Sequence, residues 1–344
     1  MPPTRTCLLL LGLVGCHVSL TTPAARSSEA FTGGRELVDL AELARLRERA
    51  ELAPDDLDAQ WSAGMAHLQA SLQGHVELRD ATERLLHRAW QLDPQGDEVP
   101  AAKVLARFLN MRSSVLDLDA IELQIALYEL LCDPRAQARG VAQMPAEQFQ
   151  FASMGLAAQA LAEYGEGHEL AAIARVRKLE RRMDRRLRAH PDEIDTHTMA
   201  GNFELTFAGV LPIAAAARLD QALLHLDIQQ NHWEGLSPGA RDADVAPNVH
   251  SVFGLWLAEG LLAADQVDRA ADAYRRVIDL PDQADTAPRR QIVALAEHRL
   301  ANLDRYAGAD ALLPVWPAGV SSCVACHSQA ATLPTDDLHW IDGP

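Results

Sequence analysis

The sequence predicts an all-α fold, and three observations support this prediction. Aromatic residues make up only 5% of the chain, whereas alanine and leucine are abundant, and this composition favours packed helices over sheets. Few segments alternate between apolar and polar residues as a half-buried strand does. Apolar residues instead recur at spacings of three and four, the period of one helix face, through residues 37–50, 120–132, 155–188, 215–228 and 252–278.

Two of the predicted helical regions share a local pattern. Residues 54–56 (Pro-Asp-Asp) are followed by Gly64, and residues 191–193 (Pro-Asp-Glu) are followed by Gly201, each glycine ten positions after its proline. This pattern resembles the first helix of tetratricopeptide repeats, in which a small residue lets two helices approach closely. Three segments resemble the end of the second helix, with a small residue, then Leu or Ile, then Pro: residues 50–54, 89–94 and 273–281.

The resemblance covers units near 40–94, 170–210 and 252–281. It implies an α-solenoid whose stacked helix pairs offer a surface to a protein, peptide or solute. Residues 95–165 and 229–250 match the repeat pattern poorly, so a less regular helical bundle stays open as the alternative.

The N-terminal residues are typical of an export signal. Arg5 supplies a positive charge, and residues 8–14 form an apolar core of seven residues, too short to span a bilayer as a helix. Residues 13–16 (Leu-Val-Gly-Cys) resemble the lipobox of bacterial lipoproteins, which implies cleavage before Cys16 and lipid on its thiol. The residue after Cys16 is His17 and not Asp. By resemblance to the sorting pattern of Gram-negative lipoproteins, this implies that the protein is anchored in the outer membrane. An ordinary secretory signal with an unlipidated cysteine is the alternative.

A complete Cys-x-x-Cys-His motif lies at residues 323–327. Two thiols at this spacing can each add to one vinyl group of a porphyrin, and the next residue, His327, is then placed to ligate the iron. The motif resembles the attachment site of c-type cytochromes. That resemblance implies one covalent haem c, held by Cys323 and Cys326 and attached outside the cytoplasm. The alternatives are a disulfide, a thioredoxin-like redox pair and a zinc site. A thioredoxin-like pair would normally lie in a βαβ unit, and a zinc site would need a second pair of ligands; neither pattern is present in the sequence.

The distal iron ligand is the second question that the motif raises. The residues after His327 include His339 and no methionine, so His339 is the candidate distal ligand of the iron. The alternative is that His339 is an exposed histidine that does not bind the iron. Methionines of the body could also approach the iron, although each is more typical of a core residue. The position of the motif resembles class II cytochromes c, but Pro317 and Gly319 interrupt the helix expected there.

These observations divide the chain into four parts: a signal peptide (1–15), a flexible tether of small and polar residues (16–35), a helical domain (36–310) and a haem-attachment segment (311–344). The formal charge is −17, and removal of residues 1–15 takes away Arg5 and makes it −18. A strongly acidic chain repels nucleic acid and favours a basic partner.

Other polar groups have ordinary interpretations. The basic residues between Arg175 and Arg186, with Glu180 and Asp184 among them, are expected to form a solvated stripe. Cys132 is expected to be a small buried residue. Three histidines in or beside a predicted loop at 231–248 fit no metal spacing and are expected to be surface or core residues: His225, His232 and His250.

The sequence therefore predicts a c-type haem protein of the cell envelope, lipid-anchored and facing the periplasm, that transfers electrons to a redox partner protein. The alternative is a repeat scaffold lipoprotein that binds a partner or solute, in which haem is structural, sensory or absent. No nucleophile elbow, phosphate-binding loop or paired carboxylates are present, so we assign no catalytic residue and favour an electron carrier or haem-binding protein over an enzyme. An enzyme that acts at an open haem face stays a third alternative.

Overall fold

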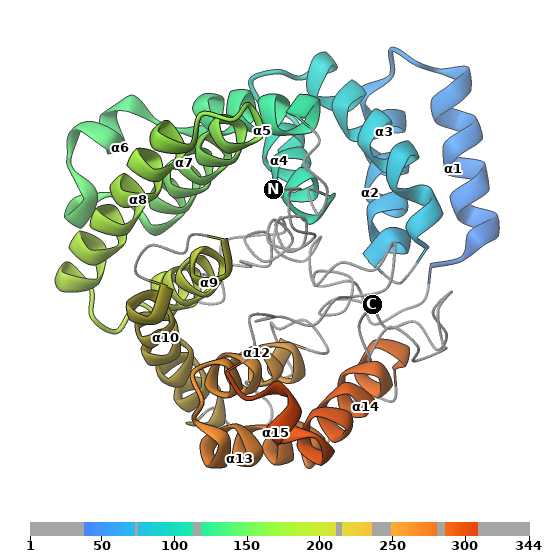
Figure 1. Ribbon diagram of the computed structural model, residues 1–344. Helices are drawn as coiled ribbons and strands as arrows, with labels where there is room; N and C mark the ends of the chain where they lie inside the picture. The colour runs from blue at the N-terminus through green and yellow to red at the C-terminus, as the bar shows by residue number, and fades with distance from the viewer. Residues whose placement is uncertain are drawn as a thin grey trace.

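The structure, a computed structural model, describes residues 38–72, 75–112, 118–210, 215–235, 249–280 and 286–308. Every regular element in these ranges is helical, which confirms the predicted all-α class (Figure 1). The α-helices are α1 (Leu40–Leu52), α2 (Leu57–Leu72), α3 (Arg79–Leu92), α4 (Ala101–Arg112), α5 (Leu118–Leu131), α6 (Pro134–Ala138), α7 (Ala146–Gly165), α8 (Glu169–Ala189), α9 (Ile194–Val210), α10 (Ala215–Gly235), α12 (Val249–Ala263), α13 (Val267–Ile278), α14 (Ala287–Ala301) and α15 (Leu303–Tyr306). Two short 3₁₀ turns are η4 (Val76–Leu78) and η5 (Val141–Gln143).

The long helices pack mainly against their neighbours in sequence. The closest pairings join α2 with α3, α5 with α7, α7 with α8, α9 with α10, and α12 with α13. Figure 1 shows the helices following one another around a curve, from α1 in blue to α14 in orange. This consecutive packing is compatible with a helical repeat. It continues through α4, α5 and α7, in the region where the repeat pattern is weakest in the sequence.

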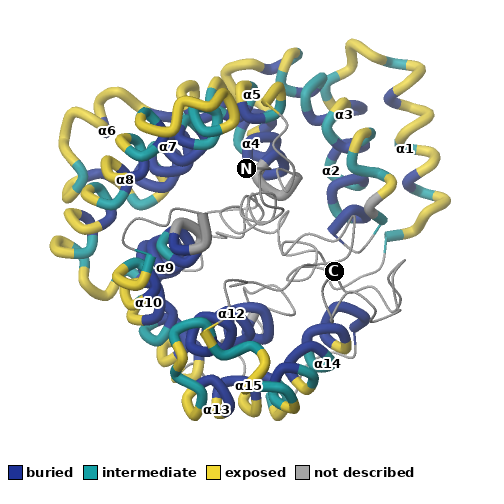
Figure 2. Tube along the Cα trace, in the orientation of Figure 1, coloured by how far each residue is buried: buried dark blue, intermediate teal, exposed yellow. Residues whose placement is uncertain are grey.

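The helices differ in how far they are buried (Figure 2). Residues 250–262 of α12 are buried without interruption, and α12 is apolar around most of its circumference. By contrast, α8 buries one stripe at spacings of three and four, and its other residues are half-buried or exposed. A helix with a single buried stripe lies at the outside of a helical layer.

One hydrophobic core runs from Leu68 on α2 to Ala296 on α14. Trp256, Tyr128 and Tyr274 are its largest fully buried side chains. Burying one large apolar side chain contributes about 1.5–3 kcal/mol, so this continuous core stabilises the helical layers more than any polar contact does.

The glycines predicted to allow close helix approach do so. A Cβ atom at Gly64 would lie 2.9 Å from Leu86 Cδ2 on α3, and one at Gly201 would lie 3.2 Å from His225 Cβ on α10. Each glycine is therefore a contact point between the first and second helix of a pair. Gly64 and Gly201 both lie ten residues after a proline, and they occupy the same packing position in the α2–α3 and α9–α10 pairs.

Two of the predicted helical stretches are interrupted. Residues 155–188 belong to α7 and α8, separated by a turn in which Gly167 has a φ of 81°. Residues 252–278 belong to α12 and α13, separated at Asp265, whose φ is 59°. Apolar spacing cannot reveal a break of three residues when the helices on both sides bury the same face. The predicted loop at 231–248 begins too early, because α10 continues to Gly235.

The predicted basic stripe on α8 is solvated only in part. Arg177, Arg181 and Arg185 are exposed, whereas Arg186 is 4% exposed. The Arg186 guanidinium donates to Glu193 at 2.5 and 2.6 Å and to the Met144 carbonyl at 2.5 Å. A buried guanidinium needs such a partner, and in the sequence Glu193 gives no sign of that role.

A buried polar cluster joins the last helices. Glu259 on α12 is 4% exposed and accepts hydrogen bonds from Tyr274 Oη at 2.7 Å and from Arg299 Nε at 3.0 Å. Burial raises the pKa of the Glu259 carboxyl, and the adjacent Arg299 opposes that rise. The Arg299 guanidinium also lies over the ring of Tyr306, 3.9 Å from its centroid. This cluster links α12, α13, α14 and α15.

Glu259→Leu is expected to lower the free energy of unfolding by about 3–5 kcal/mol, because it leaves the buried Arg299 without its carboxylate. Urea unfolding followed by circular dichroism measures this change. The matched control is Glu297→Gln on α14, whose side chain is exposed, and it is expected to change stability little. The double variant Glu259→Leu/Arg299→Met is expected to regain part of the loss. Equal stabilities for the single and double variants would contradict this account of the cluster.

Within the described ranges, no helix is long and apolar enough to cross a membrane. Cys132 is a free, buried thiol, and burial raises its pKa, which confirms the prediction of a small core residue. Four of the methionines are also core residues, as the sequence suggested: Met144, Met154, Met183 and Met199.

Candidate functional site

The residues to which the sequence assigns haem and lipid chemistry lie outside the described ranges. These are Cys16, Cys323, Cys326, His327 and His339. Their roles therefore stay predictions from the sequence.

A partly open pocket of about 240 Å³ lies between α8, α9 and α10. Its apolar wall consists of buried side chains from α8 and α9: Leu179, Met183, Ala200 and Phe203. Its polar wall carries Glu180 and Asp184 from α8, Glu204 from α9, and Gln221 and His225 from α10. The pocket thus combines apolar side chains with several polar groups, which is the general composition of a small-molecule site.

The charges around this pocket are not balanced. Arg218 on α10 forms ion pairs with Glu180 and with Glu204, the latter at 3.1 Å between Nη1 and Oε2. Asp184 is exposed and forms no ion pair with a described residue. Glu180 and Glu204 therefore share the Arg218 guanidinium, and Asp184 adds a third carboxyl group to the pocket lining.

Burial raises the pKa of Glu204 to about 7, and the nearby negative charge of Glu180 adds to the rise. Arg218 acts in the opposite direction but does not cancel these effects. Near neutral pH this carboxyl is therefore divided between its protonated and ionised forms. A second positive charge in the pocket would favour the ionised form.

His225, which lines the pocket, forms a hydrogen-bonded pair with His197 on α9. His197 Nε2 lies 2.7 Å from the Pro191 carbonyl oxygen, which can only accept, so this nitrogen carries the proton. In the neutral pair, His197 Nδ1 then accepts from His225 Nδ1–H at 2.9 Å. His225 Nε2 is left with a lone pair and no hydrogen bond from a described residue. Burial lowers the pKa of His225 to about 4, so its ring is neutral at neutral pH.

The sequence did not predict this pocket. His225 was expected to be an ordinary histidine, and Glu180 and Asp184 were expected to belong to a solvated stripe. The pocket residues come from three helices, and no local spacing joins them. The other two histidines of that group agree with their ordinary interpretation, since His232 is exposed and His250 is buried against the ring of Trp233.

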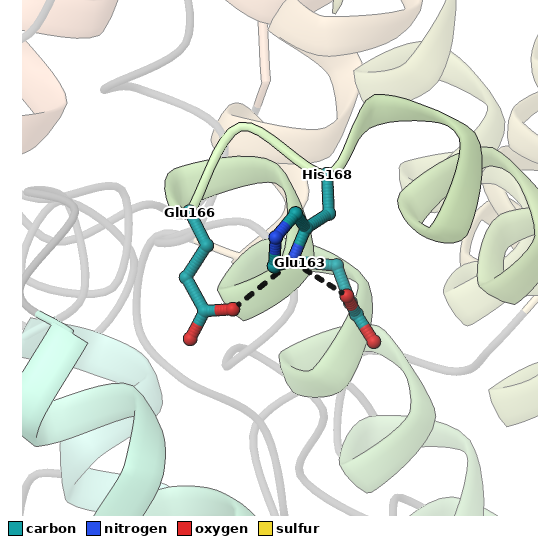
Figure 3. Close-up of side chains that lie close together, drawn as sticks. All are labelled: Glu163, Glu166 and His168. Atoms are coloured by element: carbon teal, nitrogen blue, oxygen red, sulfur yellow. Dashed lines mark ion pairs between the residues drawn. The ribbon is translucent and has the colours of Figure 1, made fainter.

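A second polar cluster lies in the turn between α7 and α8 (Figure 3). His168 Nδ1 is 3.3 Å from Glu163 Oε2 and 3.2 Å from Glu166 Oε2. One ligand atom from each residue lies within 4.8 Å of the others, a spacing that a metal ion could bridge. The cluster is local, and Glu166 and His168 are exposed, so the ion pairs already account for its geometry.

Comparisons of this chain with protein-family models, with curated proteins and with solved structures gave no match.

Proposed function

We propose that this chain is a membrane-tethered c-type haem protein that transfers electrons on the periplasmic side of the cell envelope. The observation that carries the proposal is the Cys-x-x-Cys-His motif at 323–327. Two thiols and an imidazole in this order are the donor set that covalent haem requires. Bound haem supplies an iron that alternates between the ferrous and ferric states.

The residues of the motif would have two roles, attachment of the porphyrin and coordination of the iron. Cys323 and Cys326 would hold the porphyrin through two thioether bonds, and His327 would ligate the iron from one side. His339 is the proposed ligand on the other side. A ligand on each side favours electron transfer over reaction at an open iron, because no coordination position is left for a substrate.

The N-terminal region supports the same compartment independently. An apolar core at 8–14 followed by Leu-Val-Gly-Cys at 13–16 is the pattern of an exported lipoprotein. Lipid on Cys16 and the tether at 16–35 would hold the helical domain near a membrane surface without a spanning helix. We propose the outer membrane as that surface.

The helical domain is proposed to dock the redox partner. The stacked helices form an extended surface, and the chain carries a net charge of −17. A basic partner would be steered towards such a surface, and its association rate would fall as ionic strength rises.

A spectroelectrochemical titration of protein matured with haem tests the proposed function. We expect a fully reversible one-electron change of the haem bands. Haem that is absent, or that cannot be reduced and reoxidised reversibly, would contradict electron transfer.

His339→Ala is expected to change the reduced spectrum from a six-coordinate to a five-coordinate form, because it removes the proposed distal ligand. The matched control is His232→Ala, an exposed histidine on α10, which is expected to leave the spectrum unchanged. A spectrum of the His339 variant identical to that of the unmodified protein would show that another residue is the distal ligand.

A further inference from the structure

We propose that the pocket between α8, α9 and α10 binds a small organic cation, specifically a short alkyl diamine. This activity is separate from the haem chemistry proposed above, because every residue that carries it lies in the helical domain.

The unequal charge of the pocket selects for a cation. Glu180, Asp184 and Glu204 line one pocket, in which Arg218 forms ion pairs with Glu180 and Glu204 and no described residue forms one with Asp184. An ammonium group placed there would restore the balance and would meet partly desolvated carboxylates, where a charge-assisted hydrogen bond is stronger than in water.

The unused acceptor at His225 points to a ligand that donates N–H groups. The ring is neutral, its Nδ1–H is directed to His197, and Nε2 has a free lone pair. A neutral imidazole next to carboxylates suits an ammonium ion, which donates several hydrogen bonds and accepts none.

The apolar wall and the volume indicate what joins the ammonium groups. Met183 and Phe203 are each at most 4% exposed and line the same pocket as the carboxylates. They would pack against methylene groups between the two ammonium groups. At about 240 Å³ the pocket is smaller than the roughly 300–1,000 Å³ typical of drug-sized ligands, so a compact chain fits better than a ring system.

A bare metal ion fits the pocket less well. Among the described residues, the only group with three candidate ligand atoms within 4.8 Å of one another is Glu163, Glu166 and His168. The carboxylates and the imidazole of the pocket are therefore spread too widely for one ion, whereas the two ends of a diamine can reach separate groups.

Calorimetric titration of the purified full chain with 1,4-diaminobutane at low ionic strength tests the proposal. We expect one saturable site, and we expect Glu204→Gln/Asp184→Asn to weaken it at least tenfold. The matched control is Glu297→Gln, an exposed change of the same kind on α14, which should leave the affinity unchanged. Thermal unfolding of each variant shows whether the fold is retained.

The pH dependence of binding gives a second readout that folding defects would not imitate. Glu204 ionises as pH rises through about 7, so diamine affinity should increase between pH 6 and 8. In Glu204→Gln this increase should largely disappear. The other charged groups that act on Glu204 are Glu180 and Asp184 on α8 and Arg218 on α10, and the titratable His225 on α10 lines the same pocket.

Three outcomes would overturn the proposal. They are no saturable binding of 1,4-diaminobutane, equal binding of neutral 1-butanol, and unchanged affinity in the double variant. Binding of Zn²⁺ with no binding of the diamine would also overturn it, because the pocket would then be a metal site. None of these outcomes bears on the haem, which is measured separately by its absorption.

Discussion

Replacing Cys323 and Cys326 together with alanine is expected to abolish covalent haem attachment. Each thioether requires its own thiol, so the double variant has no sulfur with which to bind the porphyrin. The measurement is haem staining of a denaturing gel after expression with a c-type cytochrome maturation system. The expected change is complete loss of a haem signal that survives denaturation.

Cys132→Ala is the matched control for this experiment. Cys132 is buried in the helical domain and free, so its removal should leave the haem signal intact. Each single variant, Cys323→Ala or Cys326→Ala, retains one thiol and is expected to keep a reduced signal. A haem signal in the double variant equal to that of the Cys132 control would show that the motif does not attach haem.

Cys16→Ser is expected to release the protein from membranes into the soluble periplasmic fraction. The hydroxyl of serine does not replace the thiol that carries the lipid, and the described helices include none that could span a bilayer. Fractionation of cells followed by immunoblotting measures the distribution. We expect almost all of the protein to move from the membrane to the soluble fraction, because the described part of the chain offers no other membrane anchor.

The control for the anchor is Cys7→Ser. Cys7 lies within residues 1–15, which the proposed cleavage removes, so this change should leave the mature protein on the membrane. Membrane association that persists in Cys16→Ser at the level of the Cys7 control would contradict lipidation at Cys16.

The sequence predicts the helices well because their signal is local. Apolar spacing of three and four reports one buried face, and the offset between Pro54 and Gly64 corresponds to the contact with Leu86 that the structure shows. The same spacing misses the turns at Gly167 and Asp265, because a short turn does not alter the face that the flanking helices bury.

The pocket could not be predicted because its residues are brought together only by packing. Glu204 and His225 come from successive helices of a pair, and Glu180 comes from the helix before that pair. The raised pKa of Glu204 depends on burial and on the charge of Glu180, neither of which a linear pattern contains. The haem motif, by contrast, could be predicted from the sequence, because all the residues that its chemistry requires lie within five consecutive positions.

Mass spectrometry of a tryptic digest of the purified, matured protein tests the central claim most directly. The account predicts that the peptide containing Cys323, Cys326 and His327 carries the added mass of one haem. Finding these two cysteines as free thiols or as a disulfide, in protein made alongside a known cytochrome that was matured successfully, would contradict it.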